Sequence, residues 1–171
     1  MILTPEQIRA NIDPHQLRGH KYYLLSGYFD PIHPGHLAML DAIPWCGASA
    51  IIVVNGDSAT RKKKDFSFMS ADIRSQIMDH MKKVEYTCVW DETDVAGCLE
   101  IIRPDFFVNG GDRSDYTTIN HKELDVCDNS GIKILYGFGG KDKKYSSSWI
   151  LDEYKNHIIT QYVADQNVKK E

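Results

Sequence analysis

Two histidines three residues apart are the most chemically suggestive feature of this 171-residue sequence. His33 and His36 lie in the stretch SGYFDPIHPGH, where Gly27 and Gly35 permit close approach of the backbone to a ligand. Imidazoles beside a helix N-terminus can donate hydrogen bonds to phosphate oxygens and stabilise charge that develops at phosphorus. The alternatives are a structural turn and a metal site, which needs a third ligand, and Asp30 is the only carboxylate near in sequence. We favour phosphate contact.

A second candidate feature is the run of four cations from Arg61 to Lys64, within GDSATRKKKD. The ordinary interpretation of such a run is a solvated loop. Beside a phosphate site, flexible cations could instead close over a polyphosphate and lower its charge.

The third cluster is VNGGDR at residues 108–113. Gly110 and Gly111 allow the backbone to pass against a flat base or a ribose. Asp112 can accept a hydrogen bond from a hydroxyl, and Arg113 can fork onto a phosphate. Taken alone the motif is weak, because many hairpin turns carry the same residues.

The fourth cluster is the serine triplet Ser146, Ser147 and Ser148, which precedes a helical pattern. Any one of the three could be an N-cap. Three hydroxyls with free backbone N–H groups also make a seat for a pyrophosphate or a triphosphate tail. Together with the histidines, the triplet favours phosphate binding.

Short β-rich apolar runs alternate with stretches of helical spacing. We expect strands at 22–25, 50–54, 86–90, 105–109 and 133–137, and helices near 35–43, 70–83, 94–102, 119–129 and 147–164. Such alternation predicts an α/β fold, a doubly wound and mostly parallel five-stranded sheet of Rossmann-like type. In this architecture ligands bind beyond the carboxyl ends of the strands. The clusters that follow the first, fourth and fifth strands are therefore expected to meet.

The composition predicts one soluble domain over residues 1–171, with an N-terminal helical extension at 1–20 and a frayed tail at about 165–171. The formal net charge of −4 argues against a nucleic-acid binder, which normally has a basic surface. No apolar run approaches the roughly 20 residues that span a bilayer, and the first residues do not resemble a secretion signal. The four cysteines are widely spaced, as in reduced thiols. We expect a cytoplasmic protein without a membrane partner.

The assembled motifs resemble those of the cytidylyltransferase-like nucleotidyltransferases. GYFDPIHPGH is similar to the GxFDxxHxGH signature of that family, and YSSSWI resembles its C-terminal signature. Intervening segments resemble the adenylyltransferase domain of heptose-phosphate enzymes and, less closely, the glycerol-3-phosphate cytidylyltransferases. The likeness covers about residues 22–157. It implies a nucleotidyltransferase fold and a reaction in which a phosphorylated small molecule attacks the α-phosphorus of a nucleoside triphosphate.

The resemblance also implies roles for individual residues. His33 and His36 would contact the triphosphate, and Lys64 would bridge the incoming phosphate and the α-phosphate. Arg74 would help to hold the phosphates, and Asp30 would orient the loop or the ribose. The other positions implied in nucleotide binding are Gly27, Tyr28, Phe29, Gly35, Asn109, Gly110, Gly111, Asp112, Arg113, Ser146, Ser147 and Ser148. Mg²⁺ would arrive with the triphosphate, held mainly by phosphate oxygens and water, so we expect no dedicated metal site.

Departures from the two subfamilies leave the substrates open. Asn109 stands where heptose-type sequences usually carry a lysine, and the arginine before the serine motif of the glycerol-type enzymes is missing. We expect ATP as donor and a sugar- or polyol-phosphate as acceptor, with a CTP-dependent enzyme of the glycerol-3-phosphate type as the alternative. A second alternative is a non-catalytic nucleotide-binding module. Homodimers are common among similar proteins, and a homodimer is the expectation here.

Overall fold

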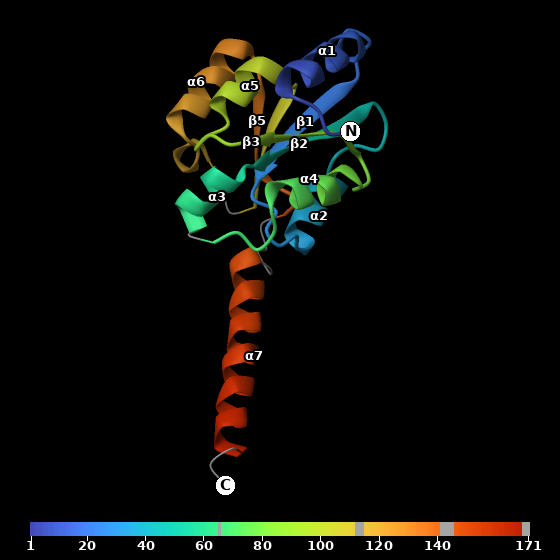
Figure 1. Ribbon diagram of the computed structural model, residues 1–171. Coiled ribbons are helices and arrows are strands. Elements are labelled where there is room, and N and C mark those ends of the chain that lie inside the picture. Colours follow the sequence, from blue (N-terminus) through green and yellow to red (C-terminus); the bar gives the residue numbers. More distant parts are fainter. Residues whose placement is uncertain (65, 112–114, 141–145, 169–171) are drawn as a thin grey trace.

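The computed structural model describes residues 1–64, 66–111, 115–140 and 146–168, with side chains up to residue 162 (Figure 1). Asp112 and Arg113, two of the expected nucleotide-binding residues, lie outside the described residues. Helices and strands alternate through most of the chain, as the sequence pattern predicts.

Five parallel strands form one sheet in the order β3-β2-β1-β4-β5. Their bounds are β1 Lys21–Gly27, β2 Ala48–Asn55, β3 Val84–Trp90, β4 Phe106–Gly110 and β5 Lys133–Phe138. The chain proceeds outward from β1 to β3, then returns to the other side of β1 for β4 and β5. Strand order therefore reverses between β1 and β4, the point at which such sheets bind ligands.

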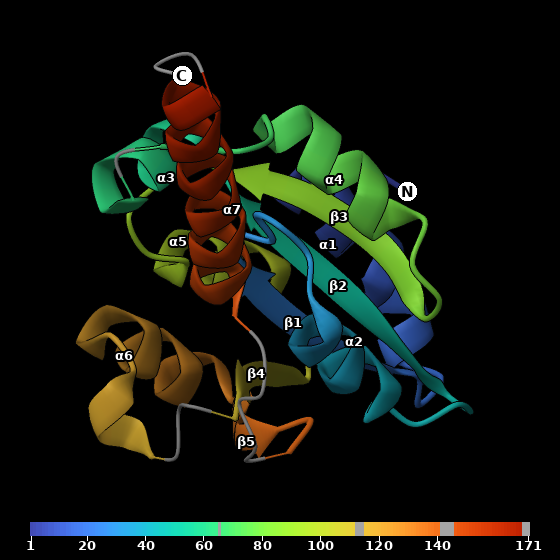
Figure 2. The same cartoon turned by 90° about the horizontal axis from the view of Figure 1, so that it is seen from below.

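Helices cover both faces of this sheet (Figures 1 and 2). Those on one face are α1 Pro5–Gln16, α5 Ala96–Ile102 and α6 His121–Ser130, and those on the other are α2 Pro34–Asp41 and α4 Ala71–Asp79. A short 3-10 helix, Tyr116–Thr118, precedes α6. Because side chains alternate along a strand, β2 sends Ile51 and Val53 into the first layer and Ile52 and Val54 into the second. The sheet is thus buried on both faces, which explains its continuous apolar runs.

The N-terminal helix belongs to the core. Thr4 caps α1 in a capping box with Gln7, and Ile8 and Ile12 are fully buried. Ahead of the helix, Leu3 N donates to Thr87 O and Thr87 N donates to Met1 O, so the first residues pair with the outer edge of β3. The segment before β1 therefore stabilises the sheet.

Helix α3, Asp57–Lys64, is an element that the sequence interpretation did not include. The ordinary interpretation of the cation run is a solvated loop, but in the structure the run forms the last turn of this helix. Its start is fixed by Asp91, whose Oδ1 accepts a hydrogen bond from Ala59 N over 3.1 Å. This carboxylate comes from the loop after β3, so its partner is distant in sequence.

Helix α7, Ser147–Val168, projects from the body as a single rod (Figures 1 and 2). It continues past residue 164, where the sequence pattern places its end. Trp149, Tyr154, Ile159 and Tyr162 are each at least half exposed along it. No helix in the described part of the chain combines the length and apolar character needed to cross a membrane.

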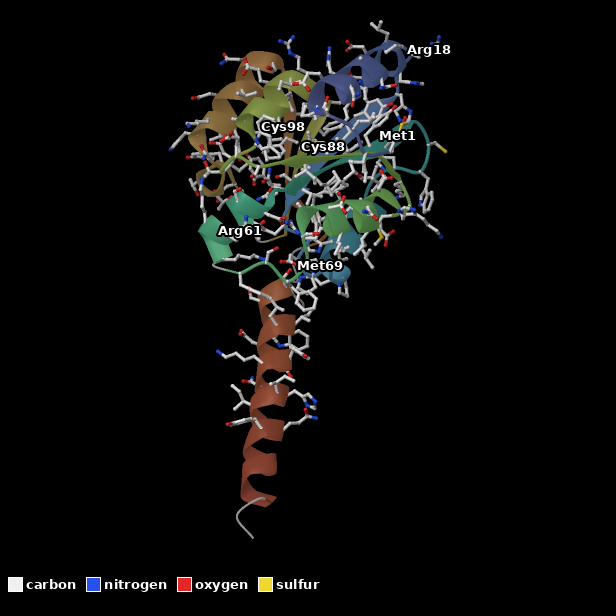
Figure 3. The ribbon with its side chains drawn as sticks, viewed as in Figure 1. Met1, Arg18, Arg61, Met69, Cys88 and Cys98 are labelled. Atoms are coloured by element: carbon white, nitrogen blue, oxygen red, sulfur yellow. The ribbon has the colours of Figure 1, made fainter. Side chains whose placement is uncertain are left out.

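The cysteines are free thiols, in agreement with their spacing. Cys88, Cys98 and Cys127 are buried, and Cys46 is exposed. Cys88 and Cys98 lie near each other inside the body, with their sulfur atoms 4.0 Å apart (Figure 3). They act as small apolar core residues.

Candidate active site

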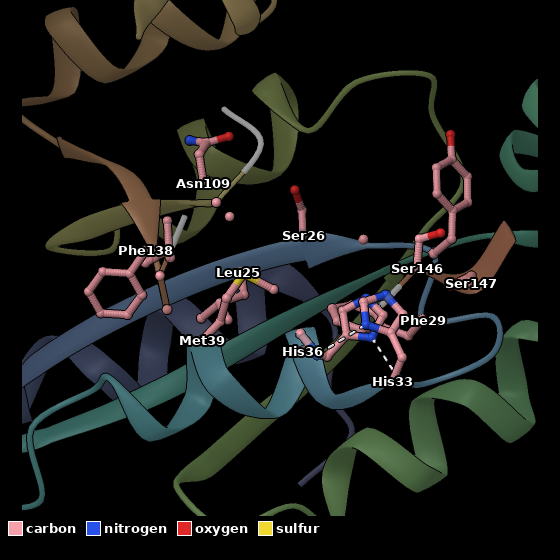
Figure 4. Close-up of a pocket in the computed structure, with 18 of the residues that line it drawn as sticks. Leu25, Ser26, Phe29, His33, His36, Met39, Asn109, Phe138, Ser146 and Ser147 are labelled. Carbon is pink, nitrogen blue, oxygen red and sulfur yellow. Dashed lines mark hydrogen bonds between the residues drawn. The ribbon is translucent and has the colours of Figure 1, made fainter. Parts of the chain in front are cut away.

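A pocket of about 320 Å³ opens at the carboxyl ends of β1 and β4, where strand order reverses (Figure 4). His33 and His36 lie at one end beside Ser146, and Asn109 and Phe138 lie at the other. The sequence-predicted residues that line it are Gly27, Tyr28, Phe29, His33, Gly35, His36, Lys64, Asn109, Gly110, Gly111, Ser146, Ser147 and Ser148. Segments far apart in sequence thus contribute to one site.

The two histidines are held by the start of α2. His33 is the N-cap residue, and its Nδ1 accepts from Gly35 N over 3.2 Å. His36 Nδ1 accepts from His33 N over 3.3 Å, which completes a capping box built from imidazoles. Since each Nδ1 accepts a backbone hydrogen bond, each neutral ring carries its proton on Nε2. Both rings are therefore Nε2–H donors.

The surroundings of His36 keep its ring neutral. Its pKa is lowered to about 3, mainly by burial and in addition by the electrostatic influence of His33 and Lys64. The two imidazoles stack with centroids 3.8 Å apart. His36 is thus an uncharged hydrogen-bond donor at neutral pH.

The ring of Phe29 packs against the ring of His36. Its ring centroid lies 4.8 Å from that of His36, and its side chain is almost fully buried. The backbone at Phe29 has φ 51°, a left-handed conformation that is unusual for an aromatic residue. A Cβ added at Gly27 would meet the Phe29 ring at 3.3 Å, so glycine leaves space for this support. Strain at this turn is typical of a functional loop.

The serine triplet lies at the start of α7 and faces the same pocket. Ser146 Oγ accepts from Trp149 N over 3.1 Å, which is the capping role. Ser147 Oγ donates to Pro31 O over 2.8 Å and so ties α7 to the histidine loop. Ser146 thus forms the cap that the sequence offered as one alternative, and all three serines also line the pocket.

Lys64 ends α3 at the mouth of the pocket. Its Nζ lies 4.8 Å from the centre of the Tyr28 ring. Burial lowers the pKa of Lys64, the nearby Asp30 opposes that shift, and Arg74 adds to it. The carboxylate of Asp30 accepts its hydrogen bonds from residues 67–69, in the chain after α3.

Asp30 anchors the chain that follows α3. Its Oδ2 accepts from Phe68 N over 2.7 Å and from Ser67 Oγ over 3.3 Å, and its Oδ1 accepts from Met69 N over 2.8 Å. Asp30 is buried and does not line the pocket. Of the two roles that the resemblance implied, the geometry favours orientation of the loop over contact with a ribose.

Arg74 lies away from the pocket, which differs from the phosphate contact that the resemblance implied. Its guanidinium is fully buried, and all five of its N–H groups donate to protein oxygens. The acceptors are Met69 O at 2.9 Å, Tyr28 O at 2.8 Å, Asn55 O at 2.7 Å, Asp57 Oδ1 at 2.8 Å and Thr60 Oγ1 at 3.5 Å. With its donors committed, Arg74 joins the ends of β1 and β2 to α3.

Several lining residues were missed by sequence reasoning. They are Leu25, Ser26, Met39, Val108, Phe138, Gly139 and Gly140. The GFGG stretch at the end of β5 carried a usable signal, because glycines after a parallel strand suit close approach to a ligand or a helix. Gly139 has φ +83°, and an added Cβ would meet Met39 N at 2.7 Å. It therefore lets the loop after β5 pack against the backbone of α2.

The described residues contain no cluster of three or more side chains suited to a metal ion. Carboxylates are also absent from the described lining of the pocket. This donor set suits a hard cation only if that cation brings its own oxygen ligands, as Mg²⁺ does on a polyphosphate.

Comparisons with known proteins place the chain in a family. The cytidylyltransferase-like profile matches residues 24–152. The chain is 26% identical to the bifunctional protein HldE of Hahella chejuensis, over 98% of this chain and 32% of that protein. It is 30% identical to a FAD synthase of Aciduliprofundum boonei, over 84% of this chain and 97% of the relative. The chain spans about a third of the HldE relative.

A solved structure shares the fold. The crystal structure of the lipopolysaccharide core biosynthesis protein from Thermoplasma volcanium superposes with a TM-score of 0.56 at 22% identity. The match covers 68% of this chain and 93% of that one. It supports the Rossmann-like architecture.

Proposed function

Because the chain belongs to the cytidylyltransferase-like family, we propose that it transfers a nucleoside monophosphate from a nucleoside triphosphate to a small phosphorylated acceptor, with release of pyrophosphate. One observation carries this proposal. The N-termini of two helices, α2 with its histidines and α7 with its serines, meet at one pocket. Helix N-termini and their N–H groups favour anions, so the pocket suits a triphosphate.

The proposed reaction is an in-line displacement. An oxygen of the acceptor phosphate forms a bond to the α-phosphorus as the bond from that phosphorus to the pyrophosphate oxygen breaks. The acceptor oxygen is ionised at neutral pH, so the step needs no general base. Catalysis then depends on positioning and on stabilising charge in the transition state.

The histidines and Lys64 divide the charge stabilisation between them. His33 and His36 would donate from Nε2 to oxygens of the transferring and leaving phosphates. Lys64 would place its ammonium between the acceptor phosphate and the α-phosphate, where two groups of negative charge must approach. Mg²⁺ would enter on the triphosphate and be held by phosphate oxygens and water.

We infer that ATP is the preferred donor and that a sugar- or polyol-phosphate is the acceptor. The VNGGDR segment supports ATP because it resembles the heptose-type adenylyltransferases more than the cytidylyl group. A FAD synthase among the relatives supports ATP too, since its named product is an adenine dinucleotide. A CTP-dependent enzyme acting on an alcohol phosphate is the alternative.

The test is pyrophosphate release across a matrix of triphosphates and sugar-, polyol- and alcohol-phosphates. We expect release with ATP and one acceptor class, and His36→Ala should lower kcat by about 10²- to 10³-fold because a transition-state donor is lost. Binding of MgATP by the same variant, measured by calorimetry, should change far less. Release by no pair, with nucleotide still bound, would instead show a non-catalytic nucleotide-binding module.

A further inference from the structure

We propose that Tyr28 is a positioning residue, which holds the ammonium group of Lys64 at the mouth of the pocket before substrates arrive. The inference rests on the proposed function, in which Lys64 meets the phosphates. Lys64 Nζ lies 4.8 Å from the centre of the Tyr28 ring, within the range of a cation–π contact. Both residues line the pocket.

The backbone of Tyr28 is held in a defined conformation. Its carbonyl oxygen accepts from Arg74 Nη1 over 2.8 Å, and the next residue, Phe29, has the left-handed φ of 51°. These constraints determine the direction in which the Tyr28 side chain leaves the loop. The ring is half-buried, which strengthens its attraction for a cation relative to a fully exposed site.

Lys64 reaches Tyr28 from a separately anchored element. The same Arg74 that binds Tyr28 O also forms an ion pair with Asp57 at the start of α3, over 2.8 Å. Beyond α3, the chain is held by Asp30 through Phe68 N. Arg74 therefore sets the loop of Tyr28 and the helix of Lys64 relative to each other.

An aromatic ring has an advantage over a carboxylate as the partner of Lys64. A carboxylate in the pocket would repel a triphosphate and would compete with it for the ammonium group. The ring of Tyr28 attracts the cation without adding negative charge, so Lys64 can turn onto a phosphate when one binds. The described lining, which contains no carboxylate, fits this arrangement.

Kinetics give the first test. Tyr28→Leu removes the ring, and we expect kcat/KM to fall about tenfold, mainly through kcat, as suits one cation–π contact. Tyr28→Phe keeps the ring and should lose less than Tyr28→Leu. In a Lys64→Gln background, adding Tyr28→Leu should lower kcat/KM by less than about twofold, because the two residues act as a pair. Equal losses in both backgrounds would overturn the proposal.

A readout independent of activity separates this proposal from the proposed function. In protein reductively methylated with ¹³C, the Lys64 resonance, assigned by its absence in Lys64→Gln, should be shifted by the ring current of Tyr28. The shift should persist in Tyr28→Phe and in the control Tyr162→Leu on exposed α7, and disappear in Tyr28→Leu. A resonance that Tyr28→Leu does not move would refute the contact. Wild-type protein with the shift but without pyrophosphate release would refute the proposed function only.

Discussion

His36 is placed where taking up a proton is unfavourable, and this makes folding depend on pH. Its pKa falls from 6.5 to about 3, mainly through burial. Below pH 6.5 the unfolded chain therefore binds a proton that the folded chain does not bind, so stability is lost as pH falls toward about 3. Above pH 6.5 both states are neutral at this ring and the loss is absent.

The first prediction follows from this difference. His36→Asn should reduce the decline in the free energy of unfolding between pH 6.5 and about 3, measured by urea titration at a series of pH values. His157→Asn, at an exposed position on α7, is the matched control and should keep the wild-type decline. An unchanged pH dependence in His36→Asn would contradict a neutral, buried His36.

The hydrogen bonds of the buried Arg74 guanidinium can be tested by a substitution that keeps its charge. Arg74→Lys retains a positive charge but cannot reach the five oxygens that the guanidinium binds. Buried acceptors are left unpaired, and we expect a loss of about 3–5 kcal/mol in the free energy of unfolding by urea titration. Arg18→Lys at the exposed surface should have almost no effect. If Arg74→Lys kept full stability but bound nucleotide more weakly, Arg74 would instead contact the phosphates, as the resemblance implies.

At the scale of elements, the contact between the loop after β5 and α2 can be tested with two neighbouring glycines. Gly139 and Gly140 both have positive φ, but only Gly139 has backbone atoms within 3 Å of an added Cβ. Gly139→Ala should therefore cost about 1–3 kcal/mol of stability beyond Gly140→Ala, as crowding does in a packed site. Thermal unfolding measures the difference, and equal costs would show that α2 and this loop move apart easily.

The elements that sequence reasoning located correctly have a local cause. Runs such as Ile51 to Val54 are apolar because both faces of a parallel sheet are covered, and Thr4 forms its cap with a residue three positions away. Their meeting at the strand ends then followed from the topology. This was sufficient to bring His33, Asn109 and Ser146 to one pocket, whereas the role of Lys64 came from the family resemblance.

The parts that were not located depend on partners distant in sequence. Helix α3 has a polar composition and gains its start from Asp91, beyond β3. The acceptors of Arg74 are mostly backbone carbonyls on separate loops, which leave no signature in residue types. The resemblance implies a phosphate ligand for Arg74, whereas in the structure its guanidinium donates to protein oxygens.

At the scale of the whole molecule, α7 differs from every other helix of the described chain. It stands clear of the body beyond its first turns, with Tyr154, Ile158 and Tyr162 exposed (Figure 1). A lone helix in water gains little from propensity alone, since most helical stability in proteins comes from tertiary packing.

Hydrogen exchange followed by mass spectrometry should therefore find two stability classes. Amides of Tyr154 to Tyr162 should exchange many times faster than those of β1 and β2, because they open without unfolding the sheet. Protection in α7 as high as in the sheet would show that another chain covers it. A homodimer of the kind expected from similar proteins would produce that result, and analytical ultracentrifugation would identify it.

The parallel sheet also has a consequence for the order in which the chain can fold. Its strands β1, β2 and β3 are neighbours in sequence as well as in space, so the first half of the chain can pair its strands during synthesis. The other side of β1 must wait for β4, whose Phe106 pairs with Tyr23. Until then an apolar strand edge that will become the middle of the sheet stays open. The nascent chain is therefore most exposed to misassociation along the line where the finished protein has its pocket.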